Sequence, residues 1–156
     1  MINDLMTFIT PENIYLIANW GVVPFWLLLI LAPNHGLTNF FTQSIVVPLL
    51  LAIAYSYLSY NLYLEKNILD GFELYSGLDG LYSVFANEIL LLVFWLHFLA
   101  ISLFAGAWIV RDARRYLIPK IITIPSLILT YFSGPIGLVV YWFIRIFFAK
   151  KISFDD

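Results

Sequence analysis

The chain has 156 residues, of which 62% are hydrophobic and only 12% are charged, and its net charge is −2. Soluble domains carry about 25% charged residues, so this composition excludes an ordinary soluble domain and indicates a membrane protein. Cysteine is absent, which excludes disulfides, thiolate nucleophiles and cysteine-ligated metal sites. The sequence contains no nucleic-acid-binding motif, and we expect no nucleic-acid partner, no metal and no cofactor.

Four stretches contain enough apolar residues to cross a hydrocarbon core, which takes about 20 residues in a helix. In chain order they cover residues 13–32, 43–64, 87–110 and 118–148. We therefore predict an all-α, polytopic membrane protein with four transmembrane helices and a single domain over residues 1–156. The connection over residues 65–86 contains glycines and alternating aromatic residues, and we expect it to form an ordered cap at the membrane interface.

The last stretch is too long for one straight crossing. Its 31 residues would extend about 46 Å at 1.5 Å per residue, whereas the hydrocarbon core is about 30 Å thick. Gly134 and Pro135 lie at its middle, where proline removes a backbone donor and bends a helix. We predict one helix that is kinked at Gly134-Pro135 and continues along the membrane surface. A re-entrant hairpin that turns at Gly134 is the alternative.

The basic residues leave the orientation in the membrane open. With four spans, four basic residues lie on one side (Arg111, Arg114, Arg115 and Lys120) and four on the other (Lys66, Arg145, Lys150 and Lys151). The positive-inside rule then gives no answer. With a re-entrant last segment, seven of the eight basic residues lie together.

The third apolar stretch carries the candidate site. Successive helical residues turn by about 100°, so one stripe of this helix contains His97, Ile101, Phe104, Trp108 and Arg111. An imidazole near the membrane middle is a candidate acid or base, and a hydrogen bond to a neighbouring helix is the alternative role. We predict substrate contacts from the stripe, from a nearby indole and from the hydroxyl-bearing face of the second helix: Trp95, Phe104, Trp108, Arg111 and Tyr60.

Small residues on the same stretch predict a helix–helix contact. Ser102 and Gly106 are four residues apart, which is the spacing that lets another backbone approach closely. We expect Gly106 to face a neighbouring helix, because only a small side chain permits that approach.

Several segments resemble one family of membrane proteins. They are Trp-Leu-His-Phe-Leu at 95–99, Leu-Phe-Ala-Gly-Ala-Trp-Ile at 103–109, Asp-Ala-Arg-Arg at 112–115, Gly-Pro-Ile-Gly-Leu at 134–138, and the proline-bounded segment 24–33. Through these segments the chain resembles the abscisic-acid-deficient-four-like family, whose plant members act as neoxanthin synthases in plastids.

The resemblance implies a carotenoid ligand and an epoxycarotenoid isomerase of the violaxanthin-to-neoxanthin type. Opening a 5,6-epoxide to an allene and an alcohol needs an acid at the epoxide oxygen and a base for a carbon-bound proton. His97 matches a position of the family pattern, and we predict it as the catalytic acid or base. Asp112, Arg114 and Arg115 match the family's segment beyond the membrane edge, where anchoring and catalysis are both open, and we predict a structural role for them. We also predict structural roles for two residues from their helical spacing, Ser102 and Gly106, and for three residues of the family's glycine–proline segment, Gly134, Pro135 and Gly137.

The chain departs from the family pattern at two positions. The pattern has Asp at Ser102 and Arg at Ala107, and losing both charges together is what the loss of an intramembrane ion pair requires. This departure favours the alternative to an isomerase, a non-catalytic pigment-binding or assembly subunit of a larger membrane complex. The expected partners are the lipid bilayer, a carotenoid, and either further copies of the chain in a homo-oligomer or a larger membrane complex. The first residues contain no basic segment typical of a targeting sequence, and we therefore expect a bacterial inner membrane.

Overall fold

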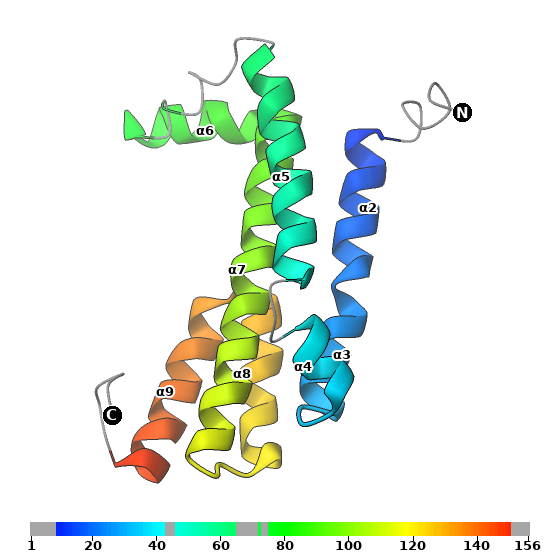
Figure 1. Cartoon of the computed structure of the whole chain (residues 1–156). Coiled ribbons are helices and arrows are strands. Elements are labelled where there is room, and N and C mark those ends of the chain that lie inside the picture. The colour runs from blue at the N-terminus through cyan, green and yellow to red at the C-terminus, as the bar shows by residue number, and fades with distance from the viewer. Residues whose placement is uncertain (1–8, 43–45, 65–71, 73–74, 151–156) are drawn as a thin grey trace. The chain divides into compact units, whose positions relative to one another are not determined.

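The computed structural model describes residues 9–42, 46–64, 72 and 75–150 (Figure 1). Within these residues every regular element is helical. The all-α prediction is therefore confirmed.

The chain packs as two compact units. Unit 1 comprises Met1–Gly21 and Leu49–Ala100, and unit 2 comprises Val22–Pro48 and Ile101–Asp156. One long helix, α7 (Glu88–Arg115), contributes its first half to unit 1 and its second half to unit 2. The single domain over residues 1–156 remains a prediction.

Unit 1 combines the first half of α7 with α2 (Pro11–Gly21), most of α5 (Val46–Leu64) and α6 (Leu78–Ala86). The start of α7 is capped by Asn87, whose Oδ1 accepts the N–H groups of Ile89 and Leu90 at 3.0 Å each, and such a cap favours a helix start. Figure 1 shows α6 lying crosswise at this end of α7, where the rings of Phe85 and Phe94 stack 4.8 Å apart.

Two predicted segments of unit 1 are only partly described. The second predicted span corresponds to α5, and its first residues, 43–45, lie outside the described residues. The predicted cap over residues 65–86 contains α6, whereas its residues 65–71 and 73–74 also lie outside.

Unit 2 combines the second half of α7 with α3 (Val23–Leu31), α4 (Gly36–Phe41), α8 (Lys120–Ser133) and α9 (Pro135–Ala149). The short helix α4 was not predicted. It is started by His35, whose Nδ1 accepts the Leu37 N–H at 3.2 Å, and is held to the end of α3 by Thr38, whose hydroxyl donates to the Ala32 carbonyl at 2.6 Å. A histidine and a threonine therefore supply the caps that a pattern of apolar residues cannot indicate.

The end of α7 differs from the prediction. The helix continues to Arg115, past the predicted end at residue 110, because arginine is a good helix former and a cation is favoured at a helix C-terminus. Leu117 then adopts a left-handed conformation with φ of 53°. The Ile118 N–H donates to the Ala113 carbonyl at 2.8 Å, which is the hydrogen bond of a Schellman cap.

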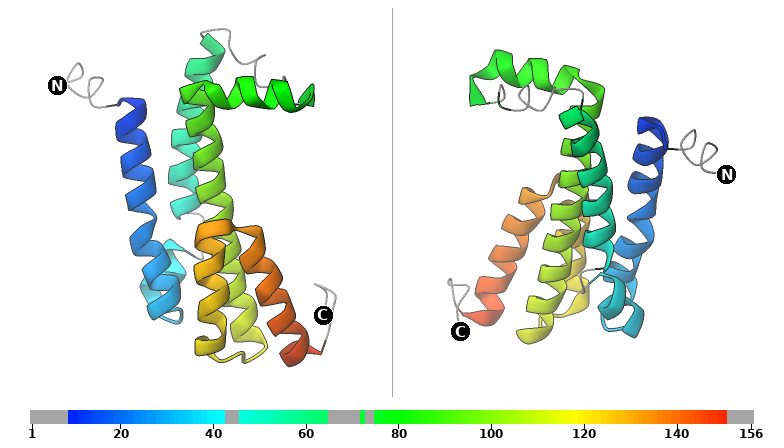
Figure 2. Two further views of the ribbon diagram at one scale, coloured as in Figure 1. Left: turned by 180° about the vertical axis from the view of Figure 1, so that it is seen from behind. Right: turned by 45° about the horizontal axis from the view of Figure 1, so that its top comes forward.

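The last apolar stretch forms a helical hairpin. Gly134, with φ of 55° and ψ of −88°, ends α8 and starts α9. Both views of Figure 2 and Figure 1 show the two helices running side by side in opposite directions. The predicted single kinked helix is therefore wrong, and the alternative, a hairpin that turns at Gly134, describes the chain. The reason is that Gly134 takes a positive φ, which reverses the backbone where a proline alone would only bend it.

Two helical stretches of the described residues are long and apolar enough to cross a membrane by length and composition, namely Pro11–Leu31, which contains α2 and α3, and Glu88–Arg115. The helices α8 and α9 are apolar but shorter. The predicted set of four transmembrane helices is therefore not confirmed.

Candidate functional site

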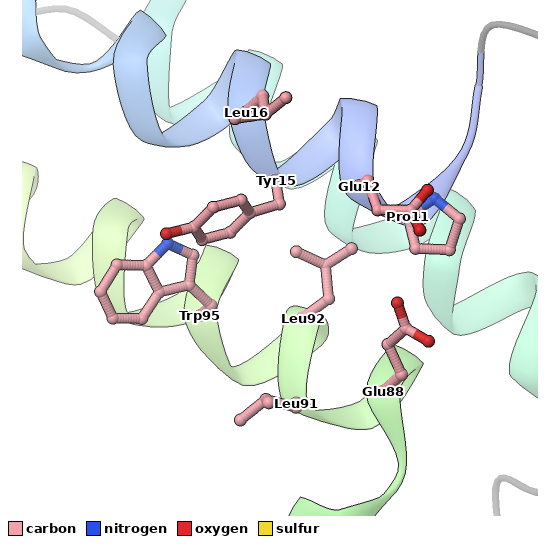
Figure 3. A pocket seen from close by; sticks show the side chains of 8 residues that line it. All are labelled: Pro11, Glu12, Tyr15, Leu16, Glu88, Leu91, Leu92 and Trp95. Carbon is pink, nitrogen blue, oxygen red and sulfur yellow. The ribbon is translucent and has the colours of Figure 1, made fainter.

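A pocket of about 510 Å³ lies between α2 and α7 inside unit 1. Two glutamates lie at one end of it, and a tyrosine and a tryptophan lie at the other (Figure 3). The lining residues are Pro11, Glu12, Tyr15, Leu16, Glu88, Leu91, Leu92 and Trp95. Its volume falls in the range of small-molecule sites, about 300–1,000 Å³.

Helical spacing brings these side chains to the pocket. Glu12, Tyr15 and Leu16 are spaced i, i+3 and i+4 on α2, and residues 88, 91, 92 and 95 repeat the same spacing on α7. Residues at this spacing share one face of a helix. Each glutamate also lies in the first turn of its helix, where the helix dipole favours a negative charge.

The carboxyl end of the pocket has no basic counterpart among the described residues of unit 1. Among the described residues of that unit there is no lysine or arginine. Glu12 and Glu88 are both exposed at the pocket mouth. Two carboxyl groups at one end of an apolar pocket are able to give and to take a proton, which is the equipment of a general acid–base pair.

The opposite end of the pocket holds an unpaired donor. The Nε1 atom of Trp95 is buried and finds no hydrogen-bond partner among the described residues. The Tyr15 ring lies 6.3 Å from the Trp95 ring, centroid to centroid, at a tilt of 41°, and Phe98 stacks on the indole at 5.4 Å. An unpaired buried donor costs about 1–3 kcal/mol, so an oxygen brought within reach of this N–H would be bound favourably.

A second polar site, the Asp112 cluster, consists of Asp112, Tyr116, Tyr141 and Arg145 in unit 2. The Oδ2 atom of Asp112 accepts hydrogen bonds from the Tyr141 hydroxyl at 2.6 Å and from Arg145 Nε at 2.9 Å. Arg145 also donates from Nη2 to the Tyr116 hydroxyl at 3.2 Å, and its guanidinium lies over the Trp142 ring at 5.0 Å. The carboxylate and the guanidinium are both buried. The cluster therefore joins the end of α7 to α9.

Of this cluster, the sequence-based predictions included Asp112 but not Tyr116, Tyr141 or Arg145. Arg145 was grouped with the basic residues of the C-terminus. A signal was present. Arg145 interrupts an apolar stretch and lies four residues after Tyr141, so both side chains share one face of α9. A charge inside an apolar helix needs a partner, and Asp112 is the one acid among the described residues of unit 2.

Most of the chain matches a known protein family. A model of the ABA DEFICIENT 4-like proteins matches residues 13–141. The chain belongs to the ABA4-like family. The resemblance inferred from the sequence is thereby confirmed. The family match includes Glu88, Trp95, Asp112 and Tyr141, whereas Glu12 and Arg145 lie outside it.

One curated relative illustrates the ABA4-like family. The chain is 26% identical over 134 residues to "Protein ABA DEFICIENT 4, chloroplastic" from Arabidopsis thaliana, an alignment that covers 84% of this chain and 60% of the relative. The chain thus spans less than two thirds of that relative's length. No solved structure matches the chain. The expected bacterial inner membrane is contradicted, because this relative is named as a chloroplastic protein.

The residues predicted to act on substrate do not gather in one place. Trp95 lines the unit 1 pocket. His97 is exposed on α7, with its ring 6.5 Å from the Tyr55 ring, and is not among the pocket residues. In this ABA4-like chain the catalytic role of His97 remains a prediction.

The other predicted contacts lie mainly on exposed surface. Tyr60 is exposed on α5, and Phe104 and Arg111 are exposed on the unit 2 half of α7. Trp108 is half-buried, with its ring 5.6 Å from the Tyr141 ring. Their contacts with a substrate also remain predictions. Among the described residues no group of histidine, aspartate and glutamate side chains could hold a metal ion.

The residues predicted to be structural lie mostly at close contacts within unit 2. A Cβ at Gly106 would lie 2.7 Å from the buried Trp26 ring, and a Cβ at Gly137 would lie 2.1 Å from the Thr130 hydroxyl. Pro135 supplies the first residue of α9 after Gly134. Ser102 is buried, as is Ala107. Two exposed residues contact neighbours: Arg114 donates to Asn39 at 3.2 Å, and Arg115 lies 5.8 Å from the Tyr116 ring.

Proposed function

We propose that this ABA4-like chain is a multi-pass membrane protein that binds an oxygenated carotenoid in the unit 1 pocket and isomerises its epoxide end group. The observation that carries the proposal is the pairing of an apolar, aromatic pocket with two carboxyl groups at one end. Family membership supports the carotenoid class, because the name of the curated relative refers to abscisic acid deficiency. The name of this relative also describes it as chloroplastic, which supports a chloroplast membrane as the location of the chain.

The surface of the chain supports the membrane part of the proposal. Large apolar side chains are exposed along several of the described helices, including Leu31, Ile53, Ile121 and Phe147. Water would disfavour this surface, whereas lipid accepts it. We keep four membrane-inserted segments in the proposal, with the last one in the form of the α8–α9 hairpin.

The size of the pocket indicates which part of the ligand it holds. A volume of about 510 Å³ accommodates a substituted ring but not a whole carotenoid. We place the oxygenated end ring in the pocket, and the polyene chain then lies along the apolar helix surfaces. Tyr15 is 42% exposed and lies next to Trp95. A movement of its ring would let a ring oxygen accept a hydrogen bond from the indole N–H.

The two carboxyl groups supply the proton transfers of the isomerisation. One protonated carboxyl group donates to the epoxide oxygen as its bond to ring carbon breaks, which gives the alcohol. The other, as carboxylate, takes the proton from the neighbouring chain carbon, and the electrons of that bond form the new double bond of the allene. Nothing is oxidised or reduced. Glu88 lies within the family match and Glu12 does not, so we assign the acid role to Glu88.

A pigment-binding or assembly subunit without catalysis is the second candidate. Ser102 and Ala107 favour it, because both are buried in the second half of α7 and neither is charged. The family pattern has an Asp and an Arg at these two positions. This candidate retains the pocket and the ligand but performs no proton transfer.

Co-expression of the full chain with an epoxycarotenoid-producing pathway tests the proposal, with chromatography of both the total extract and the pigment bound to the purified protein. We expect an allenic product that is absent when Glu88→Gln is expressed at the same level. Bound but unchanged pigment would exclude the isomerase and favour the second candidate. Neither conversion nor bound pigment would refute both.

A further inference from the structure

The helices of the C-terminal hairpin are too short to cross a membrane. α8 has 14 residues and α9 has 15. At 1.5 Å per residue they extend about 21 and 22 Å, whereas the hydrocarbon core is about 30 Å thick. A hairpin of this length that enters a membrane ends inside it.

The turn of the hairpin has the composition of a buried membrane segment. No charged residue occurs from Ile121 to Ile144. The side chains that flank the turn are apolar and exposed, Phe132 by 72% and Ile136 by 58%. A turn that emerged into water would expose both of them, which water disfavours.

The polar groups at the turn are largely paired inside the hairpin, as hydrocarbon requires. The Gly134 N–H donates to the Thr130 carbonyl at 2.9 Å, and the Gly134 carbonyl accepts from the Leu138 N–H at 3.3 Å. Pro135 has no N–H to satisfy. The buried hydroxyls of Ser126 and Thr130 each donate to a carbonyl of α8 at 2.7 Å.

The open end of the hairpin has the opposite character. The ends of α7 and α9 and the start of α8 meet there, as Figure 2 shows. Five exposed basic residues lie near this end and are called the basic rim: Arg111, Arg114, Arg115, Lys120 and Lys150. The one acid among the described residues of unit 2, Asp112, is buried against Arg145. Counted over the described residues of unit 2, the rim therefore carries a net positive charge.

Aromatic residues mark the same level. Tyr116 and Trp142 enclose the guanidinium of Arg145, at 4.8 and 5.0 Å from its central carbon. Tyrosine and tryptophan gather at the boundary between lipid and water, and basic residues near that boundary attract anionic headgroups. The Asp112 cluster and the basic rim thus have the chemistry of a membrane interface.

We propose that α8 and α9 form a re-entrant hairpin, which enters the bilayer from the side where α7 ends, turns at Gly134 within the hydrocarbon and returns to the same side, where the basic rim binds anionic lipid headgroups. The inference rests on the membrane location in the proposed function and not on the pocket or its chemistry. It places all six basic residues of the described part of the chain on one side: Arg111, Arg114, Arg115, Lys120, Arg145 and Lys150. The positive-inside rule then identifies that side as the cytoplasmic or equivalent side.

The absence of cysteine from the sequence permits a clean test by single-cysteine labelling. Leu117→Cys and Lys150→Cys mark the open end, and Phe132→Cys marks the turn. Each full-length variant is reconstituted in vesicles of known orientation and treated with a membrane-impermeant maleimide from either side. A spin label at each position then reports depth through its accessibility to oxygen and to a polar nickel complex. Variants whose thermal unfolding matches the parent are used.

We expect positions 117 and 150 to be labelled from one and the same side. Position 132 should be labelled from neither side, and its spin label should lie deep in the hydrocarbon. Labelling of position 132 from the opposite side would show two full crossings and overturn the proposal. Labelling from the same side as position 117 would show a hairpin on the surface and would also overturn it. Neither result would affect carotenoid binding by the pocket, so the two proposals fail separately.

The lipid part is tested by reconstitution into vesicles of phosphatidylcholine alone and of phosphatidylcholine with phosphatidylglycerol. We expect the anionic lipid to raise the unfolding temperature of the parent, and the double variant Arg111→Gln, Arg115→Gln to lose most of that increase. The single variant Glu88→Gln, which removes a charge in unit 1, serves as the control and should keep it. An equal increase in the parent and the double variant would overturn binding of headgroups by the rim.

Discussion

The side chain of Arg145 on α9 donates from Nε to Oδ2 of Asp112 on α7 at 2.9 Å, with both residues buried. The same carboxylate oxygen accepts the Tyr141 hydroxyl at 2.6 Å. Two positions 33 residues apart in the sequence are thus joined. Because a buried charge without its partner is costly, each residue requires the other.

Removal of the arginine alone should be strongly destabilising. We expect Arg145→Met to lower the free energy of unfolding by about 3–5 kcal/mol, because it leaves the Asp112 carboxylate buried without a cation. The double variant Asp112→Leu, Arg145→Met should recover much of this loss. Arg111→Met, at an exposed position of the same unit, is the control and should change stability by about 0.5 kcal/mol or less. Thermal unfolding in detergent measures all three, and a single variant as stable as the parent would contradict the role of the pair.

The contact between the hairpin helices predicts a second effect. A Cβ at Gly137 would lie 2.1 Å from the Thr130 hydroxyl oxygen and 2.2 Å from the Thr130 backbone nitrogen. Backbone cannot move aside as a side chain does, so Gly137→Ala should separate α8 from α9 and cost more than the about 1–3 kcal/mol typical of an overpacked core. Gly21→Ala is the matched control, since nothing lies within 4 Å of its Cβ. Equal unfolding temperatures for the two variants would refute the close contact.

Gly106 allows a graded comparison with Gly137. A Cβ at Gly106 would lie 2.7 and 2.8 Å from two ring atoms of Trp26. The neighbour is a side chain, which can shift although it is buried, so we expect Gly106→Ala to be destabilising by about 1–3 kcal/mol and less so than Gly137→Ala. Gly106→Leu should be worse than Gly106→Ala. Stability unchanged by the leucine would show that α7 does not pack on Trp26.

The acid role of Glu88 leads to a kinetic prediction. Glu88→Gln keeps the size of the side chain and removes the exchangeable proton, so we expect conversion to fall by about 10²–10⁴-fold while bound pigment is retained. Asp79→Asn changes an exposed carboxylate of α6 that does not line the pocket, and it should leave conversion unchanged. Pigment chromatography of cells with matched protein levels measures both. Full conversion by Glu88→Gln would remove Glu88 from the mechanism.

The sequence and the pocket lead to different predictions for His97. The sequence predicts His97 as the acid or base at a position that matches the family, but its side chain is exposed beside Tyr55 and does not line the pocket. We therefore expect His97→Gln to convert pigment at the rate of the parent chain in the same chromatographic assay. A loss of conversion with unchanged pigment binding would instead restore His97 as the acid or base.

Some features of this protein follow from local sequence. Long apolar stretches with few charges determine helices, because a helix satisfies its own backbone wherever lipid or core surrounds it. The break at Gly134 and Pro135 is equally local, since proline removes a donor and glycine admits a positive φ. The motif around Trp95 and His97 was enough to indicate the family. The repeated spacing of Glu12 and Glu88 with their following apolar residues was also visible, although one helix face does not show which other face it meets.

Other features depend on which helices pack together. Gly134 and Pro135 permit either a kink or a reversal. The reversal fits the close contact of Gly137 with Thr130, which a local pattern does not contain. The partner of Arg145 and the union of α2 with α7 into one pocket likewise join residues distant in the sequence. Local sequence determines backbone conformation through short-range sterics and hydrogen bonds, whereas the pairing of distant faces depends on the packing and desolvation of side chains from both partners at once.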